Sequence, residues 1–207
     1  MTAKDYLTQK MTEEDYLATE PYSAVKREYI DGYVYAMAGT KLSHNRISVN
    51  MLTLLNNHLK GTPCQPYIAD IKVKTAKNYY YPDVLVDCSN LDDNSTYSEN
   101  PVLIVEVLSK STRRMDEVIK RAAYKQIASL EAYLLIEQDM AEIEIIRRST
   151  GWQSEKYLLG DSFELSFIGL TLRVEDIYER VNNEDMVEWL AKKALEAQEN
   201  QQQESSP

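Results

Sequence analysis

Two carboxylates lie inside short apolar segments that have the composition of buried β-strands. Asp83 belongs to residues 79–87 and Glu106 to residues 102–108, and both segments are rich in β-branched, aliphatic or aromatic residues. Removing a carboxylate from water is costly unless a cation, a proton or hydrogen bonds compensate. If the two segments are neighbouring strands, both side chains can converge on one hard divalent cation, because such ions prefer oxygen ligands.

The alternation of side chains along each strand and a lysine on the next helix both favour a metal site at these carboxylates. Side chains alternate along a strand, so Asp83 shares a face with Leu85, and Glu106 shares a face with Ile104. Magnesium takes only one or two protein carboxylates, which leaves room for a phosphate oxygen and an activated water. Lys120, on the helix expected after the Glu106 strand, could orient that water and stabilise charge on the phosphate. The alternative is that Lys120 and Glu106 form a purely structural ion pair.

The charge distribution limits the kinds of partner that the chain could bind. The 207 residues carry a formal charge of −10, which argues against a simple nucleic-acid coat. About half of that excess lies after residue 174, whereas residues 110–125 hold six basic residues against two acidic ones. Because charges are screened beyond about 8–10 Å, this local patch could meet phosphates on an acidic protein, although charge alone slightly favours a solvated helix face.

Composition and the first residues predict a cytoplasmic protein. Hydrophobic residues make up 43% of the chain, without an apolar run near the roughly 20 residues that span a bilayer. The first residues lack the pattern of a signal peptide. Cys64 and Cys88 form no metal-binding motif, and we expect both to be reduced.

Periodicity and turn signals predict a mixed α/β domain at residues 11–181, between a disordered N-terminus at 1–10 and an acidic helical or disordered tail at 182–207. Asp31-Gly32 indicates a hairpin turn within residues 26–38. The pattern further predicts helices at about 12–20, 43–60, 111–130 and 175–181. Strands are expected at 67–74, 79–87, 102–108, 133–137, 142–145, 152–159 and 163–172. Residues 88–101 are expected to form a loop, and residues 201–206 to be disordered.

The helix predicted at 111–130 has two candidate faces. Met115, Val118, Ile119, Ala122 and Ala123 form an apolar stripe that we expect to face the core. Beside this stripe lies a polar row at i, i+4, i+8 spacing, which contains Arg113, Asp116, Lys120 and Tyr124.

The order of these motifs resembles the PD-(D/E)XK nuclease superfamily and, more narrowly, the Uma-two family, which is classed with restriction endonucleases. The likeness runs over roughly residues 10–180. It rests on Glu28 to Tyr35, His44, Pro82-Asp83, Glu106-Val107-Leu108, Ser111-Thr112-Arg113, Asp116, Lys120, Tyr124 and Glu131 to Leu134.

The resemblance implies an α+β restriction-endonuclease-like fold, with a central mixed β-sheet flanked by helices. It also implies hydrolysis of DNA phosphodiester bonds that depends on Mg²⁺, with Mn²⁺ as a possible substitute. Asp83 and Glu106 carry over as metal ligands, the Val107 carbonyl as a possible third ligand, and Glu28 as a further acidic site residue.

One position departs from the superfamily pattern. The superfamily lysine lies two residues after the glutamate, where this chain has Leu108. Members of the Uma-two family place a lysine on the following helix, which points to Lys120. Lys110 is the alternative, because it would lie on the Glu106 face if the strand continued.

Several other candidates have simpler explanations. Glu28 could instead pair with Lys26 or Arg27 on a hairpin surface. His44 could cap its helix or make a structural hydrogen bond rather than contact substrate or transfer a proton. The remaining possible substrate contacts are Arg113, Tyr124 and Lys110, and Tyr124 is more simply a core residue.

Three functions remain open at this stage. The first is a metal-dependent DNA endonuclease, for which nuclease relatives suggest a homodimer. The second is a catalytically inactive nuclease-fold module that binds DNA or protein. The third is a structural protein that assembles through its acidic C-terminal helix.

Overall fold

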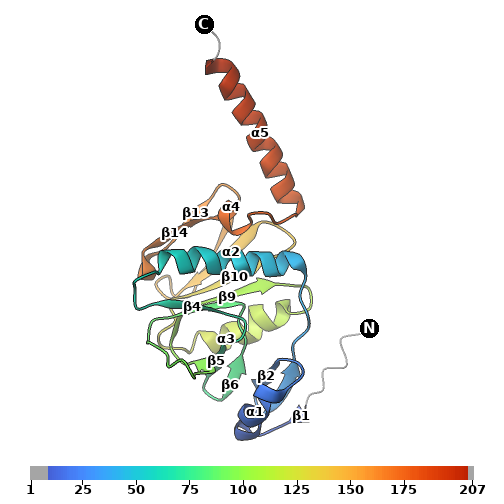
Figure 1. Cartoon of the computed structure of the whole chain (residues 1–207), viewed down its shortest axis with the longest axis vertical. Coiled ribbons are helices and arrows are strands. Elements are labelled where there is room, and N and C mark those ends of the chain that lie inside the picture. The colour runs from blue at the N-terminus through green and yellow to red at the C-terminus, as the bar shows by residue number, and fades with distance from the viewer. Residues whose placement is uncertain (1–8, 205–207) are drawn as a thin grey trace.

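The central sheet of this computed structural model, which describes residues 9–204, is mixed and six-stranded (Figure 1). β9 and β10 run parallel and the other neighbouring pairs run antiparallel. In spatial order the strands are β12 (Ser154–Leu158), β11 (Glu142–Arg147), β10 (Ala132–Glu137), β9 (Pro101–Leu108), β7 (Val84–Asp87) and β4 (Gln65–Ile68).

A second sheet and a small hairpin complete the strands. The second sheet contains, in spatial order, β1 (Gln9–Lys10), β3 (Tyr33–Ala36), β2 (Arg27–Ile30), β6 (Asn78–Tyr80), β5 (Lys72–Thr75) and β8 (Tyr97–Ser98). The hairpin consists of β13 (Ser162–Leu165) and β14 (Leu170–Arg173). The mixed sheets and their covering helices confirm the predicted α+β class.

Each face of the central sheet is covered by a different helix. On one face Val105 and its neighbours pack against Ile47 and Met51 of helix α2 (Leu42–His58). On the opposite face Ile104 and Leu108 belong to a cluster that includes Tyr124. Tyr124 ends α3 (Arg121–Tyr124), which continues directly from a π-helical turn, η2 (Met115–Lys120).

The remaining helical segments lie at the two ends of the chain. They are α1 (Glu13–Thr19), η1 (Glu20–Tyr22), η3 (Ser166–Ile168), α4 (Val174–Ile177) and α5 (Glu184–Glu204). Figure 1 shows α5 extending away from the sheets. Within residues 9–204, no helix combines the length and the apolar character needed to cross a membrane.

Local signals predicted several of these elements correctly. Thr12 caps α1 by accepting a hydrogen bond from the Asp15 backbone N–H, as its side-chain oxygen allows. β2 and β3 pair on either side of Asp31 and Gly32, both of which have positive φ angles. The predicted hairpin is therefore confirmed.

Three predicted strands are in fact pairs of strands. The 67–74 segment divides into β4, in the central sheet, and β5, in the second sheet, because the chain turns at Ala69, which has a φ of 37°. The 79–87 segment divides into β6 and β7 around Pro82, which has no N–H to donate to a strand ladder. The 163–172 segment folds back at Gly169, and the expected loop 88–101 contains β8.

Two helix predictions also require correction. The helix predicted over 111–130 ends at Tyr124, and Val118 and Ile119 of its supposed core stripe are 60% and 40% exposed. The tail helix is longer than expected and continues through Glu204, so disorder at 201–204 is wrong, whereas residues 205 and 206 lie outside the described residues. Of the predicted disordered N-terminus, Gln9 and Lys10 form β1 and residues 1–8 are likewise outside.

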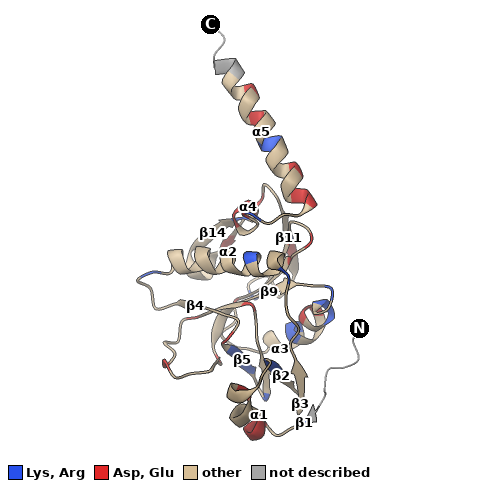
Figure 2. Cartoon of the chain, turned by 45° about the vertical axis from the view of Figure 1, so that its right-hand side comes forward, with Lys and Arg blue, Asp and Glu red and all other residues tan. Residues whose placement is uncertain are grey.

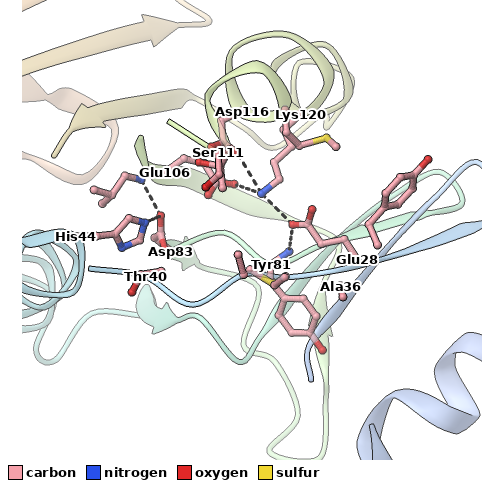
Figure 3. A pocket seen from close by; sticks show the side chains of 16 residues that line it. Glu28, Ala36, Thr40, His44, Tyr81, Asp83, Glu106, Ser111, Asp116 and Lys120 are labelled. Carbon is pink, nitrogen blue, oxygen red and sulfur yellow. Dashed lines mark hydrogen bonds and ion pairs between the residues drawn. The ribbon is translucent and has the colours of Figure 1, made fainter. Parts of the chain in front are cut away.

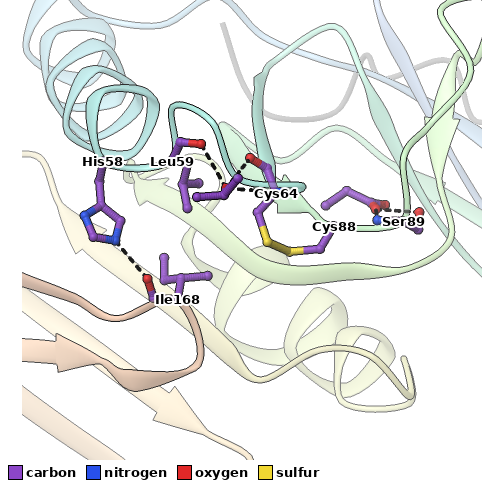
Figure 4. The surroundings of a disulfide bond; sticks show 8 residues. His58, Leu59, Cys64, Cys88, Ser89 and Ile168 are labelled. Carbon is purple, nitrogen blue, oxygen red and sulfur yellow. Dashed lines mark hydrogen bonds between the residues drawn. A yellow bond between two sulfur atoms is a disulfide. The ribbon is translucent and has the colours of Figure 1, made fainter.

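The two cysteines are joined in a disulfide, which contradicts the expectation that both are reduced. Cys64 lies after α2 and Cys88 directly follows β7, with their Cα atoms 3.9 Å apart (Figure 4). The pairing of β4 with β7 brings the two positions together, since Gln65 pairs with Asp87. This contact depends on strand pairing between distant segments, which cysteine spacing alone does not reveal.

Candidate active site

Asp83 and Glu106 come from adjacent antiparallel strands and lie on the same face of the central sheet. Val84 pairs with Val105, and Leu85 with Ile104. Continuing this register by one residue places Asp83, immediately before β7, opposite Glu106. Both side chains line one cavity, as the sequence predicted.

Lys120 lies at the centre of a buried charge cluster in that cavity (Figure 3). Its Nζ atom lies 2.9 Å from Glu28 Oε1, 3.1 Å from Glu106 Oε1 and 3.2 Å from Asp116 Oδ1. All four side chains are at most 8% exposed. The helix therefore turns Asp116, Lys120 and Tyr124 toward the sheet, while Val118 and Ile119 of the predicted apolar stripe are exposed.

Glu28 belongs to this cluster rather than to the hairpin surface. The alternative partners are engaged elsewhere, since Lys26 pairs with Asp70 and Arg27 pairs with Glu20. Glu28 Oε1 also accepts a hydrogen bond from the Tyr81 backbone N–H at 3.0 Å. That bond fixes the carboxylate against the segment that leads into Asp83.

Asp83 has two polar partners of its own, the Val107 backbone and His44. Its Oδ2 atom accepts a hydrogen bond from the Val107 backbone N–H at 2.7 Å and lies 3.3 Å from His44 Nε2. His44, in the first turn of α2, is buried. The histidine thus contacts a predicted metal ligand, which is a more specific role than capping its own helix.

The pKa values of Glu106, Asp116 and Lys120 are all raised in this cluster, for different reasons. Burial raises the pKa of Glu106 well above its usual value, Lys120 acts against this shift, and the carboxylates of Asp116, Asp83 and Glu28 reinforce it. Burial also raises the pKa of Asp116. Burial alone would lower the pKa of Lys120, but the three carboxylates outweigh it and raise that pKa, so Lys120 remains an ammonium.

Tyr124 contacts the cluster through Glu106 and does not line the cavity. Its hydroxyl donates a hydrogen bond to Glu106 Oε1 at 3.1 Å, and the whole side chain is buried. Burial and the nearby carboxylates raise the pKa of Tyr124 well above its usual value, which keeps the hydroxyl protonated as a donor. Tyr124 is therefore both a core residue and a partner of the site.

The cavity itself has a volume of about 170 Å³. Four carboxylates and one ammonium line it, together with His44 and several small or hydroxyl-bearing residues. Figure 3 shows Thr40 near His44 and Asp83, and Ser111 near Glu106 and Asp116. The remaining lining residues are Tyr35, Ala36, Met37, Ala38, Tyr81, Val107, Thr112 and Met115.

Two predicted substrate contacts lie outside this cavity. Arg113 forms a two-pronged ion pair with Glu137, at 2.6 Å for both bonds, and also contacts Glu117. Lys110 is exposed and follows the end of β9, so the strand does not carry it onto the Glu106 face. Lys120, not Lys110, reaches Glu106.

Asp116 was not singled out as a site residue by sequence reasoning, although it belongs to the motif that carried the family resemblance. The signal that could have found it is its position four residues before Lys120, which places both side chains on one helix face. The Tyr81 backbone contact to Glu28 had no sequence signal, because it depends on how the two sheets meet.

Comparisons with known proteins identify the family. Residues 13–175 match the family Uma2, described as "Putative restriction endonuclease". The chain belongs to the Uma2 family. The predicted Uma-two resemblance is therefore confirmed over most of the chain.

Similar proteins cover most of this Uma2 chain. It is 38% identical to the uncharacterized protein slr1290 of Synechocystis sp. (strain ATCC 27184 / PCC 6803 / Kazusa), over 82% of this chain and 92% of that protein. It is 31% identical to the uncharacterized protein sll1609 of the same organism, over 77% and 94%.

A solved structure supports the fold. The crystal structure of "a putative nuclease belonging to DUF820" from Anabaena variabilis ATCC 29413 aligns with a TM-score of 0.64 at 16% identity, and covers 83% of this chain and 99% of that one. At this identity the likeness shows a shared fold, which is consistent with the restriction-endonuclease-like fold.

Proposed function

We propose that this Uma2 protein is a Mg²⁺-dependent endonuclease that hydrolyses phosphodiester bonds in DNA. The observation that carries the proposal is the pairing of Asp83 and Glu106 in one cavity, with the Lys120 ammonium 3.1 Å from Glu106. Membership of a family described as restriction endonucleases, and the fold shared with a protein described as a nuclease, support the same reaction class.

The residues present fit a hard cation that uses few protein ligands. Within residues 9–204, no group of three or more His, Cys, Asp or Glu side chains is arranged to hold a metal ion. Magnesium does not need such a group, because it keeps several waters and takes one or two carboxylates. Asp116 Oδ1 is buried without a hydrogen bond and contacts Lys120 only as an ion pair, so the cluster retains unused oxygen capacity.

Asp83, Glu106 and the Val107 carbonyl would hold the ion. The N–H and C=O of one residue in an antiparallel strand point toward the same neighbour. Since the Val107 N–H donates to Asp83, the Val107 carbonyl faces the same side. When bound, Mg²⁺ supplies Lewis-acid polarisation of a phosphate oxygen and lowers the pKa of a water.

The role of Lys120 follows from its charge. Because the surrounding carboxylates keep it protonated, it serves as a hydrogen-bond donor and a positive charge rather than as a general base. In the proposed reaction it orients the attacking water and stabilises the negative charge that develops on the phosphate. Glu28 anchors the ammonium from the side opposite Glu106.

Plasmid cleavage tests the proposal. We expect nicking in Mg²⁺ or Mn²⁺ and none in excess EDTA. We further expect rates at least 100-fold lower for Asp83→Asn, Glu106→Gln and Lys120→Met, the order of magnitude for the loss of one stabilising group. Matched controls are Glu99→Gln and Lys125→Met, which alter the same residue types outside the cavity. Cleavage that persists in all three site variants would contradict the assignment.

A non-catalytic nuclease-fold module is the second candidate. It is favoured by the full engagement of Lys120 with three carboxylates and of Asp83 with Val107 and His44, because an idle site would keep these contacts. Isothermal titration with MgCl₂, and separately with DNA in EDTA, distinguishes the two. Heat from DNA alone, with none from Mg²⁺ and no cleavage, would support the binding module.

The proposal also includes a homodimer, because cutting both strands of a duplex commonly uses two copies of a nuclease. Sedimentation across a range of protein concentrations tests this part. A monomer at every concentration, with and without DNA, would contradict it.

A further inference from the structure

A second cavity opens beside the acidic one and has the opposite character. Its volume is about 250 Å³, and it shares Ala38, Thr40, His44, Ser111 and Thr112 with the first cavity. The residues that line only the second cavity include Lys41, Ser109, Lys110 and Gln138. The two cavities therefore form one continuous depression with an acidic part and a basic part.

The ammonium groups of the two lysines in the second cavity have few carboxylate partners, so they can pair with an anionic ligand. Lys41 is 67% exposed, and its ammonium pairs with a single carboxylate among residues 9–204, that of Asp139, at 3.5 Å. Lys110 is exposed and has no ion-pair partner in the part of the chain that the structure describes. This contrasts with Lys120, which three buried carboxylates neutralise. In Figure 2 basic positions lie on the chain leading into α2 and around α3.

Gln138 is an independent indication of a ligand. Its side chain is only 3% exposed, it lines the second cavity, and its Oε1 atom has no hydrogen-bond partner among the described residues. A buried amide without a partner costs free energy that a bound polar group would recover. Turning the amide by half a rotation exchanges its oxygen and nitrogen, so the same position can offer an N–H donor.

The loop between β9 and the helix supplies hydroxyl groups in a fixed arrangement. Ser109 Oγ lies 3.0 Å from both Ser111 Oγ and Thr112 Oγ1. Hydroxyls, an amide and ammonium groups are together the donors that bind phosphate oxygens. The first cavity differs, because its one ammonium, that of Lys120, already contacts three carboxylates.

We propose that this second cavity binds a DNA phosphate next to the phosphodiester that is cut, through Lys41, Lys110 and Gln138. This inference rests on the proposed endonuclease function and extends it by naming where the strand is held. The acidic part, loaded with its cation, would then face one phosphate while the basic part holds its neighbour. His44 and Ser111, which line both cavities, mark the boundary between the two positions.

DNA binding without cleavage tests this inference. Fluorescence anisotropy with a labelled DNA duplex, in EDTA, compares the wild-type protein with Lys41→Ala/Lys110→Ala. We expect the dissociation constant to rise about tenfold or more, and the slope of log affinity against log salt to shrink by about 1, since each neutralised phosphate contributes roughly 0.9. The matched control is Lys60→Ala/Lys77→Ala, which removes the same charge from exposed lysines outside both cavities.

The outcomes separate this inference from the proposed function. Equal affinities for the two double variants, or no DNA binding by the wild-type protein, would overturn the phosphate site. Binding that depends on Lys41 and Lys110, in a protein that never cleaves DNA, would support the phosphate site while contradicting the endonuclease. Cleavage that requires Asp83 and Glu106 but has an unchanged KM in Lys41→Ala/Lys110→Ala would support the endonuclease and contradict the phosphate site.

Discussion

Lys120 Nζ lies 3.1 Å from Glu106 Oε1, although the two residues are fourteen positions apart and belong to a helix and a strand. The distance is short because the helix that follows β9 turns back over the same face of the sheet. A helix that buries its lysine must expose something else, and here it exposes Val118 and Ile119. Placement of one ammonium therefore sets the orientation of the whole helix.

The buried ion cluster should contribute strongly to stability in the metal-free protein. Lys120→Met leaves three buried carboxylates without their cation, so we expect the free energy of unfolding to fall by about 3–5 kcal/mol. Urea denaturation in EDTA measures this. Adding Glu106→Gln to Lys120→Met should recover part of the loss, and a single variant as stable as the wild-type protein would contradict the prediction.

His44 should act on the proposed metal site through Asp83. Its Nε2 atom lies 3.3 Å from Asp83 Oδ2, so His44→Ala removes a partner that orients the carboxylate. We expect Mg²⁺ affinity to fall about tenfold or more, the usual effect of losing a partner of a metal ligand. Isothermal titration measures the affinity. His58→Ala, at the other end of α2, is the control and should leave it unchanged.

The hydroxyl of Tyr124 should stabilise Glu106 without taking part in chemistry. Tyr124→Phe keeps the packing but removes the 3.1 Å hydrogen bond to Glu106, so a loss of about 1.5–3 kcal/mol in unfolding free energy is expected. Chemical denaturation measures the loss. Cleavage should survive under conditions where the variant is folded; complete inactivation of a folded variant would instead indicate that the hydroxyl contacts substrate.

The Cys64–Cys88 bond should make stability sensitive to reductant. The two cysteines are separated by 24 residues, and closing a loop of that size stabilises a protein by about 3 kcal/mol through the unfolded chain. Dithiothreitol should therefore lower the denaturation midpoint of the wild-type protein. The variant Cys64→Ser/Cys88→Ser should already have the lower midpoint and show no further response, and an unresponsive wild-type protein would argue against the bond.

Sequence reasoning predicted the convergence of Asp83 and Glu106 better than it predicted their surroundings. Asp83 and Glu106 could be recognised because a lone carboxylate in an apolar strand is unusual, and strand alternation fixes which way each points. The same reasoning failed for the helix that carries Lys120, because hydrophobic periodicity assumes that the apolar side is buried. Here the carboxylates of Glu28 and Glu106, which lie on other elements, hold Lys120 against the sheet and reverse that rule, and their positions are not local information.

Sequence reasoning named Glu28 as a site residue but did not predict its partner, nor that of either cysteine, for a related reason. Glu28 has basic neighbours in sequence, yet its partner Lys120 lies on another element and is brought near only when the two sheets assemble. Likewise, Cys64 and Cys88 meet because β4 pairs with β7. In each case the deciding contact joins segments that no single stretch of sequence describes.

The antiparallel register of β7 and β9 determines which changes in chain length the protein can accept. The register is regular from Val84 to Val86 and becomes irregular only beyond Val86, at the end distant from Asp83. Extra residues in the connection between the two strands would leave the carboxylates facing each other. A single residue inserted between positions 83 and 86 would instead turn Asp83 to the side of the sheet that α2 covers. The connection between β7 and β9 can therefore change in length, whereas residues 83–86 cannot.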